Sequence, residues 1–245
     1  MKLYDHSHLM NYSIPVYEIQ RKQGIGFIPK QIGSASICKY HDKYYIITAG
    51  HVIEENKHTL SFGIIDDLLF DKCMTHTMNN NDRDLAIIEI SKKIVDEIML
   101  RSVEVNIVVK VIDLDIDEFN IVYRVIQGTF SLIGYPYSRS DLNYKQHKVT
   151  MEEKIISGKL ISGSEYNSTY CYAVQYDRKH INYDTKKNIT GIHPRGMSGC
   201  PVWKIDFSNP GKKEFAGVFI EFHKSEKSLV ITRSEILFKM LEEIE

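Results

Sequence analysis

The sequence predicts an all-β protein, built as a sandwich or as barrels, with a helix at its C-terminal end. Most apolar segments are short, are rich in β-branched and aromatic residues, and alternate with polar residues, as β-strands do. Clusters of Gly, Pro, Asn, Asp and Ser separate these segments, as turns do. The predicted strands span residues 35–40, 43–50, 85–90, 106–114, 119–126, 128–135, 171–176, 200–205, 215–222 and 228–233.

Helical spacing of apolar side chains occurs in two places. The first is KKIVDEIMLR, residues 92–101, where the apolar residues share one face. The second is TRSEILFKMLEEIE, residues 232–245, whose apolar residues repeat with the same period. Thr232 and Glu235 have the spacing of a capping box in front of this second helix.

The composition excludes several classes of partner. The chain has 245 residues, with 31 basic and 32 acidic side chains, whereas a general nucleic-acid binder would carry a basic excess. No apolar run approaches the roughly 20 residues that cross a membrane. The histidines and cysteines show no metal-ligand spacing. We therefore expect no nucleic acid, no membrane, no metal and no cofactor.

The N-terminal segment and the cysteines indicate a cytoplasmic protein. Asp5, His6 and His8 interrupt the start of the chain, so that no continuous apolar region of a signal peptide is present. The four cysteines show no CxxC spacing, and a core of this size does not depend on disulfides. We therefore expect reduced thiols.

The segment GIHPRGMSGCPVW, residues 191–203, places Ser198 among glycines and ahead of a predicted strand. A turn explains such a composition by itself. The alternative is a catalytic serine, but a hydroxyl is a weak nucleophile unless a base accepts its proton and a third group orients that base. The chain offers His51, at the end of the strand in YYIITAGHVIE, and Asp84, at the start of the strand in NNNDRDLAIIEI. Taken singly, this histidine is typical of a packed or solvated side chain, and this aspartate of a turn.

The segments TAGH, DLAII and GxSG occur in this order on a strand-rich chain. Together they resemble the chymotrypsin-like (trypsin-like) serine peptidases, which carry T-A-A-H or T-A-G-H, D-[IL]-A-[LIV] and G-[DNM]-S-G-G-P segments in the same order. LIGYP at 132–136 and FAGVFIEF at 215–222 resemble further strands of that family. The resemblance spans about residues 24–244.

The resemblance implies two antiparallel six-stranded β-barrels followed by the C-terminal helix, in a single peptidase domain with the active site between the barrels. The first barrel, about residues 15–122, would carry the histidine and the aspartate. The second barrel, about residues 123–231, would carry the serine, and the helix would occupy residues 232–245.

The resemblance also implies the role of each residue. Ser198 would attack the scissile carbonyl, His51 would accept the proton and return it to the leaving amine, and Asp84 would orient the imidazole. Asp82 is the alternative acid, although the DLA context favours Asp84. In the family, the oxyanion is bound by the backbone N–H groups of the serine and of the glycine two residues before it, here Ser198 and Gly196.

Two residues beside the serine depart from the family pattern. Cys200 stands where the family has glycine, and a redox or nucleophilic thiol is a minor alternative to a simple replacement. Met197 replaces the acidic residue that precedes the serine in digestive members, where it pairs with an N-terminal amine freed by proteolysis.

The specificity residues are less defined. The family's usual offset from the serine leads to Ile192, which does not support a preference for Lys or Arg. Ile220 and Glu221 are the other predicted substrate contacts, and Glu221 could favour a basic residue. We expect His193 and Arg195, which precede the glycine, to be solvated loop residues.

The predicted function is a cytoplasmic serine endopeptidase that cleaves selected protein or peptide substrates and is regulated by an activating protein partner. Stand-alone domains of this kind resemble effectors of bacterial defence or regulatory proteolysis. One alternative is an α/β-hydrolase, but GMSGC lacks the last glycine of GxSxG and is not followed by a helix start. The other alternative is a peptidase-shaped binding module without turnover.

Overall fold

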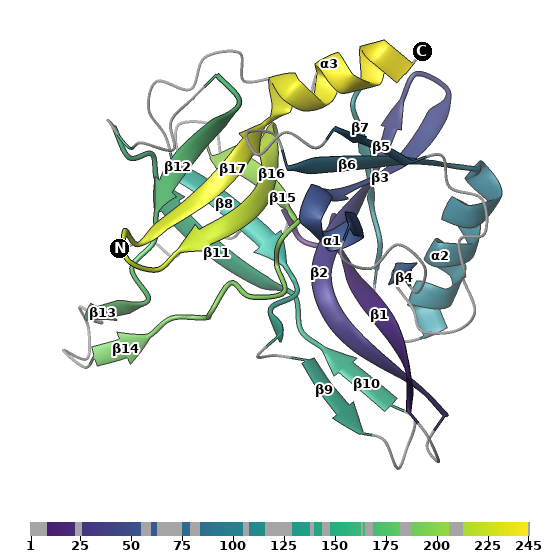
Figure 1. Cartoon of the computed structure of the whole chain (residues 1–245), viewed down its shortest axis with the longest axis horizontal. Coiled ribbons are helices and arrows are strands. Elements are labelled where there is room, and N and C mark those ends of the chain that lie inside the picture. Colours follow the sequence, from purple (N-terminus) through teal and green to yellow (C-terminus); the bar gives the residue numbers. More distant parts are fainter. Residues whose placement is uncertain are drawn as a thin grey trace.

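The computed structural model describes two large β-sheets that lie side by side, with one helix across them (Figure 1). The first sheet is built from the N-terminal half of the chain and the second from the C-terminal half. The described residues are 9–22, 26–54, 60–62, 75–78, 84–104, 108–115, 129–137, 140–143, 148–162, 164, 169–181, 188–205 and 213–244. The predicted strand 119–126, Asp82 and Cys73 lie outside them.

The first sheet has seven described strands in the order β4-β1-β2-β3-β6-β5, with β7 added on β2. They are β1 (Ile14–Lys22), β2 (Gly26–Tyr40), β3 (Lys43–Ala49), β4 (Leu60–Phe62), β5 (Thr75–Met78), β6 (Leu85–Ile90) and β7 (Val111–Asp113). All the pairings are antiparallel except that of β7 with β2, which is parallel.

The prediction of a six-stranded, purely antiparallel first sheet is therefore wrong. The cause is the length of β2, which is a strand of 15 residues. Its pairing with β1 stops at Ala35, opposite Ile14, and from Ser36 onward β3 occupies one edge. The other edge is taken by β7, which pairs with Ile37 and its two successors and satisfies backbone groups that β1 no longer reaches.

The second sheet has six described strands in the order β11-β8-β15-β16-β17-β12, all antiparallel, as predicted. They are β8 (Thr129–Gly134), β11 (Lys154–Lys159), β12 (Cys171–Gln175), β15 (Pro201–Ile205), β16 (Lys213–His223) and β17 (Ser228–Arg233). A bridge between Leu160 and Val174 joins its two edges, so this sheet curls into a barrel. Two small hairpins accompany it, β9 (Ser140–Asn143) with β10 (Lys148–Met151), and β13 (Lys179–Ile181) with β14 (Asn188–Thr190).

Three helices are described: α1 (Gly50–Glu54), α2 (Lys92–Glu104) and α3 (Ser234–Ile244). The helix predicted at 92–101 continues to Glu104, and the predicted C-terminal helix is present. The capping box at Thr232 is wrong, because Thr232 pairs with Cys171 in the ladder between β12 and β17. The strand thus continues up to the first residue of the helix. No helix in the described part of the chain is long and apolar enough to cross a membrane.

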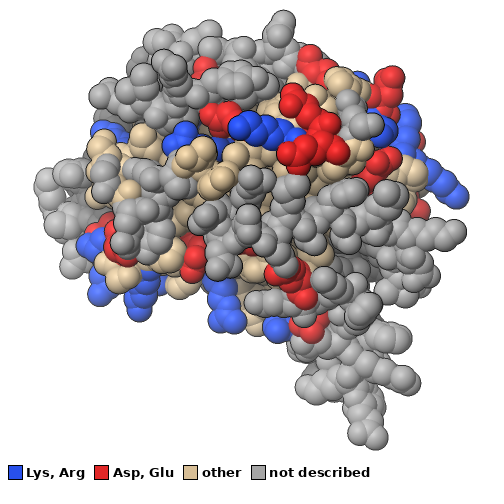
Figure 2. All heavy atoms as spheres, turned by 45° about the horizontal axis from the view of Figure 1, so that its top comes forward, with Lys and Arg blue, Asp and Glu red and all other residues tan. Residues whose placement is uncertain are grey.

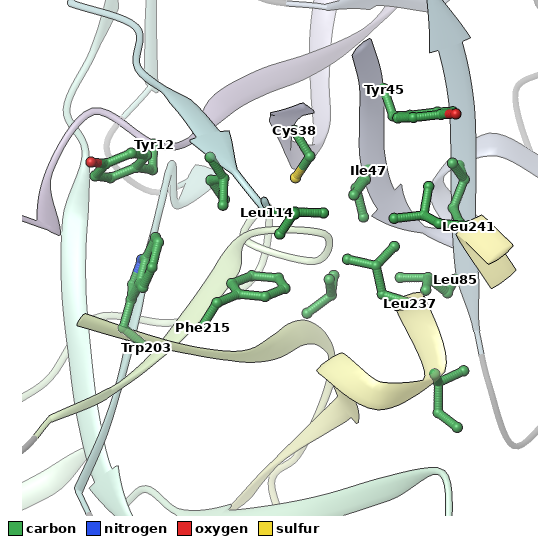
Figure 3. Packing of buried hydrophobic residues seen from close by; sticks show 14 of the residues in the cluster. Tyr12, Cys38, Tyr45, Ile47, Leu85, Leu114, Trp203, Phe215, Leu237 and Leu241 are labelled. Atoms are coloured by element: carbon green, nitrogen blue, oxygen red, sulfur yellow. The ribbon is translucent and has the colours of Figure 1, made fainter. Parts of the chain in front are cut away.

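A shared apolar cluster holds the two sheets and α3 together (Figure 3). Trp203 of the second sheet packs against Tyr12, with ring centroids 5.1 Å apart, and against Phe215, at 5.7 Å. Leu237 and Leu241 of α3 join the same cluster, together with Tyr45, Ile47 and Leu85 of the first sheet. The C-terminal helix therefore follows the second sheet in sequence but buries its apolar face against both sheets.

The surface carries both signs of charge. Figure 2 shows Lys and Arg side chains interspersed with Asp and Glu among the described residues of the face around α3. Ion pairs of opposite charge on the described surface include Lys39 with Asp113 and Lys204 with Glu214.

Glu153 is a buried carboxyl group that fastens the N-terminal segment to the second sheet. Its Oε2 accepts the backbone N–H of Asn11 at 2.9 Å, whereas its Oε1 is buried with no hydrogen-bond partner among the described residues. Burial raises the pKa of Glu153 to about 7, although the backbone N–H groups of Asn11 and Ser13 and the charge of Lys110 act in the opposite direction.

Protonation of Glu153 is expected to stabilise the fold. Its pKa lies near 7 in the folded protein against an ordinary value of 4.5, so this stabilisation is complete below pH 4.5 and is lost as the pH rises through 7. The difference corresponds to a free energy on the order of 3 kcal/mol. Urea unfolding of the wild type and of Glu153→Gln, from about pH 4.5 to about pH 8, measures this effect. The stability of the wild type relative to the variant should fall over that range, and a constant difference would contradict the assignment.

Candidate active site

A cleft of about 440 Å³ lies where the two sheets meet, and the predicted triad residues line it. One wall comes from the first sheet, with His51 in α1 and Asp84 directly before β6. The other wall comes from the loop before β15 and from β16. The residues lining the cleft are His51, Asp84, His193, Pro194, Arg195, Ser198, Phe219, Ile220, Glu221 and Phe222.

His51 and Asp84 are joined by two hydrogen bonds. The Nδ1 atom of His51 lies 2.7 Å from Oδ2 of Asp84, and the backbone N–H of His51 donates to Oδ1 at 2.8 Å. The side chain of His51 is 41% exposed and that of Asp84 is 24% exposed, so the imidazole reaches the cleft while the carboxylate lies behind it. A carboxylate at Nδ1 places the ring proton there and leaves Nε2 as the basic nitrogen.

The backbone of Asp84 is held in an uncommon conformation. Its φ is 30°, in the left-handed region that residues other than glycine rarely adopt. The carbonyl of Asp84 accepts the backbone N–H of Gly50 at 3.0 Å, while its carboxylate holds His51. Strain of this kind persists only where surrounding contacts impose it, and here those contacts are the bonds to Gly50 and His51 at the start of α1.

Ser198 lies on a loop that is pressed against the first sheet. Its carbonyl accepts the backbone N–H of Ser34 at 2.8 Å. The next residue, Gly199, has a φ of 93°, and a Cβ atom there would lie 2.0 Å from the carbonyl oxygen of Ser34 and 2.1 Å from Oγ1 of Thr48. Only glycine fits this position, because both the conformation and the close approach exclude a side chain.

The peptide groups around Ser198 have fixed orientations. The carbonyl of Arg195 accepts the backbone N–H of Tyr137 at 2.8 Å, and the carbonyl of Met197 accepts that of Cys200 at 2.9 Å. In a trans peptide the N–H points away from the carbonyl of the same group, so these bonds orient the N–H groups of Gly196 and Ser198. Within the described part of the chain neither of these two N–H groups donates a hydrogen bond. Of these two residues, Ser198 lines the cleft and Gly196 is buried.

Ser34 and Gln31 support this arrangement from the first sheet. The hydroxyl of Ser34 donates to the carbonyl of Gly196 at 2.9 Å and accepts the backbone N–H of Tyr135 at 3.2 Å. The side-chain amide of Gln31 donates to the carbonyls of Tyr135 and Gly196. Thr48 donates to the carbonyl of Ser34 at 2.7 Å. Buried side chains of the first sheet thus fix the loop that carries Ser198.

Comparisons with known proteins place this geometry on a known fold. No protein-family model matches the sequence, and no curated protein matches it. The structure resembles the serine endoprotease from Yersinia pestis, with a TM-score of 0.51 and 18% identity, over 95% of this chain and 62% of that chain. It also resembles the protease of tobacco vein mottling virus, with a TM-score of 0.50 and 10% identity, over 94% of this chain and 79% of that chain.

The fold is chymotrypsin-like. At these identities the likeness extends to the fold alone. It agrees with the predicted β class and C-terminal helix, although the closed barrel is clear only for the second sheet. The antiparallel sheets exclude the α/β-hydrolase alternative, which requires a largely parallel sheet with helices on its faces.

Of the predicted substrate contacts, Ile220 and Glu221 line the cleft and Ile192 does not. The pairing of β16 with β17 shifts register between Phe219 and Glu221, so that Ile220 forms a bulge. A bulge re-aims neighbouring side chains, and here four consecutive residues of β16 reach the cleft. Ile192 instead packs against the core of the second sheet. The prediction counted a fixed number of residues back from Ser198, and such a count takes no account of the local course of the loop. Gly196, the other residue predicted to bind the oxyanion, is not among the residues that line the cleft.

The sequence analysis missed four residues of the cleft wall. His193 and Arg195 are loop residues, partly exposed and exposed as expected, and they also line the cleft, as do Pro194 and Phe222. The ring of His193 packs against the edge of Phe222, with centroids 5.8 Å apart. Residues 193–195 lie close to Ser198 in the sequence, and this closeness could have predicted their place in the cleft wall. Phe222 reaches the cleft wall through the bulge in β16, which the sequence does not indicate.

Cys200 and Met197 are both fully buried. Burial raises the pKa of the Cys200 thiol, which opposes a nucleophilic role for it, because the thiolate is the reactive form. The three described cysteines, Cys38, Cys171 and Cys200, are free thiols.

Loss of the Ser34 hydroxyl is expected to destabilise the fold. Ser34→Ala leaves the buried carbonyl of Gly196 with one donor fewer and the N–H of Tyr135 without its acceptor, which costs about 2 kcal/mol of unfolding free energy. Ser36→Ala is the matched control, since Ser36 is buried on the same strand and, among the described residues, its hydroxyl is hydrogen-bonded only to the Cys38 sulfur, at 4.0 Å. Equilibrium unfolding should show a loss for Ser36→Ala below about 0.5 kcal/mol. Equal losses in the two variants would contradict the role given to Ser34.

Proposed function

We propose that this chain is a serine endopeptidase that hydrolyses peptide bonds of protein substrates, with Ser198 as nucleophile, His51 as general base and Asp84 as orienting acid. The observation that carries the proposal is the hydrogen bond between His51 and Asp84 at the cleft that Ser198 lines, on a chymotrypsin-like fold. The neighbouring folds belong to proteases of a bacterium and a plant virus, which supports a protein substrate.

In the acylation step, Ser198 Oγ attacks the carbonyl carbon of the scissile bond while Nε2 of His51 accepts the hydroxyl proton. The electron pair of the C=O bond moves to oxygen, and the N–H groups of Gly196 and Ser198 bind the resulting oxyanion. His51 then returns the proton to the leaving amine as the C–N bond breaks. This leaves an acyl-enzyme on Ser198.

In the deacylation step, a water molecule attacks the acyl carbon while His51 accepts its proton. Collapse of the second tetrahedral intermediate releases the carboxylate product and restores the proton to Ser198 Oγ. Throughout both steps Asp84 holds the proton of His51 on Nδ1 and stabilises the imidazolium.

The three residues are expected to act as one unit. Ser198→Ala and His51→Ala should each lower kcat by about 10⁴-fold or more, and the double variant should be little worse than either single one. Asp84→Asn should also lose most turnover, because the ring proton is no longer fixed on Nδ1. Turnover of a peptide substrate by each variant measures kcat, and a serine-reactive fluorophosphonate probe, followed by identification of the labelled peptide, tests whether Ser198 is the nucleophile.

Asp82→Asn is the matched control for the acid, since it changes the alternative aspartate two residues away. It should retain labelling at the wild-type rate. Loss of labelling in Asp82→Asn but not in Asp84→Asn would mean that the acid is Asp82. A wild-type chain that is folded yet never labelled would favour the binding module without turnover.

Activity is expected without a freed N-terminal amine. The position before Ser198 is Met197, which is buried and cannot accept an amine, and the buried carboxyl of Glu153 is held by the backbone N–H of Asn11. Hydrogen bonds within the chain already orient the N–H groups of Gly196 and Ser198, which also argues against a need for an activating partner. The test is turnover of a chain with an uncleavable N-terminal fusion, compared with the same chain after removal of the fusion. Activity that appears only after removal would contradict this expectation.

A further inference from the structure

We propose that the cleft beside Ser198 selects an acidic side chain, Glu or Asp, on the substrate residue whose carbonyl is attacked, and that His193 is the residue that recognises it. This inference rests on the proposed function and names its substrate class. The carbonyl under attack lies at the N–H groups of Gly196 and Ser198, and residues 193–195 directly precede this pair. The side chain of that substrate residue is therefore the one closest to His193, Arg195 and Phe222.

The hydrogen bonding of His193, which lines the cleft, leaves its Nε2 as a donor. The backbone N–H of Arg195 donates to Nδ1 of His193 at 3.1 Å. Because a backbone N–H can only donate, Nδ1 must be the acceptor, and the ring proton of the neutral imidazole lies on Nε2. The edge of Phe222 packs against the ring at an interplanar angle of 85° and fixes its orientation. A substrate group that accepts a hydrogen bond therefore matches His193, and a group that only donates does not.

The charges of three cations act on His193. Partial burial lowers its pKa, and the charges of Arg178, Arg195 and Lys224 lower it further. Arg178 is held nearby, since its Nε donates to the carbonyl of Gly191 at 3.4 Å, and Arg195 lines the cleft itself. The same positive charges that lower this pKa attract a carboxylate and repel an ammonium group.

The carboxylates of the cleft are already engaged. Asp84 is hydrogen-bonded to His51. Glu221, which the sequence analysis considered as a partner for a basic substrate residue, pairs with Nε2 of His223 at 3.0 Å and is 63% exposed. A carboxylate on the substrate gains from both the donor of His193 and the surrounding cations, whereas a carboxamide gains from the donor alone.

The loop that carries His193 is fixed before any substrate arrives. The hydroxyl of Tyr176 donates to the carbonyl of Ile192 at 2.7 Å, and the backbone N–H of Tyr137 donates to the carbonyl of Arg195 at 2.8 Å. The ring of Tyr176 also packs against Phe222, at 6.0 Å between centroids. A donor in a fixed position discriminates between substrates because it needs no rearrangement to bind the matching group.

The test uses four peptidyl diphenyl phosphonates that differ only in the side chain at the reactive residue, which is that of Glu, Gln, Leu or Lys. The rate at which each one blocks fluorophosphonate labelling of Ser198 is measured. The Glu compound should react about tenfold or more faster than the Gln and Leu compounds, as a hydrogen bond to a charged group predicts, and the Lys compound should be slowest. A Glu compound no faster than the Leu compound, or a Lys compound that is fastest, would overturn the proposal.

Two variants assign the preference to His193. The ratio of the Glu rate to the Leu rate within each protein is the readout, so that a general loss of reactivity cancels. His193→Ala should lower this ratio several-fold, and the cations that remain should keep it above one. His41→Asn, which replaces an exposed histidine in the turn between β2 and β3 with a residue that tolerates its φ of 50°, should keep the wild-type ratio. An unchanged ratio in His193→Ala would refute the role of His193.

The same experiment separates the two levels of inference. The fluorophosphonate carries no amino-acid side chain, so its reaction with Ser198 depends on the catalytic residues and not on the acidic subsite. Absence of labelling in the wild type would refute the proposed function. Labelling together with no preference for the Glu compound would refute the acidic subsite alone.

Discussion

The contact between Ser34 and the loop of Ser198 is the constraint on which the candidate site depends. Ser34 lies on β2, close to the point where this strand exchanges β1 for β3 as its partner. Its N–H binds the carbonyl of Ser198, its hydroxyl binds the carbonyl of Gly196, and its own carbonyl accepts from Thr48. Its hydroxyl also accepts the N–H of Tyr135, so this one buried residue makes four hydrogen bonds at the junction of the sheets. Buried polar groups of this kind keep their partners because the unpaired state is costly.

The residues of the site come from the two sheets on either side of this junction. His51 and Asp84 belong to the first sheet, where the end of β3 and the start of β6 are neighbours in the ladder. Ser198 belongs to the loop that enters the second sheet. Their relative position is set by the bonds of Ser34 and, at a distance, by the apolar cluster around Trp203, into which α3 inserts Leu237 and Leu241. A close-packed interior is hardly compressible, so a shift of one packed element displaces its neighbours. The packing of α3, a helix remote from the cleft, therefore contributes to the geometry of the cleft.

The sequence predicts the features that depend on local patterns. Alternating apolar residues predict the strands, and periodic ones predict α2 and α3, because both patterns follow from backbone geometry. Features that depend on contacts between distant segments were missed or wrong. The strand β7 pairs in parallel with β2 because β2 continues beyond its pairing with β1. Thr232 pairs with Cys171 in a β-ladder, and Phe222 reaches the cleft through a bulge. The triad residues were named from three short motifs, and their roles remain a proposal that the geometry supports.

The loop of Ser198 is held by neutral hydrogen bonds and apolar packing. The residue before the serine is Met197, fully buried in the core of the second sheet, and the carbonyl of Gly196 is bound by a hydroxyl and an amide. Besides burial, the charge of Glu153 raises the pKa of the nearby Cys200, and Glu153 is hydrogen-bonded to the backbone of Asn11. Hydrogen bonds between uncharged groups do not titrate and are little affected by salt. An ion pair in the same place would depend on both the pH and the salt concentration. The orientation of the two N–H groups beside Ser198 therefore follows from the folded chain itself and does not depend on a charge that must first be created.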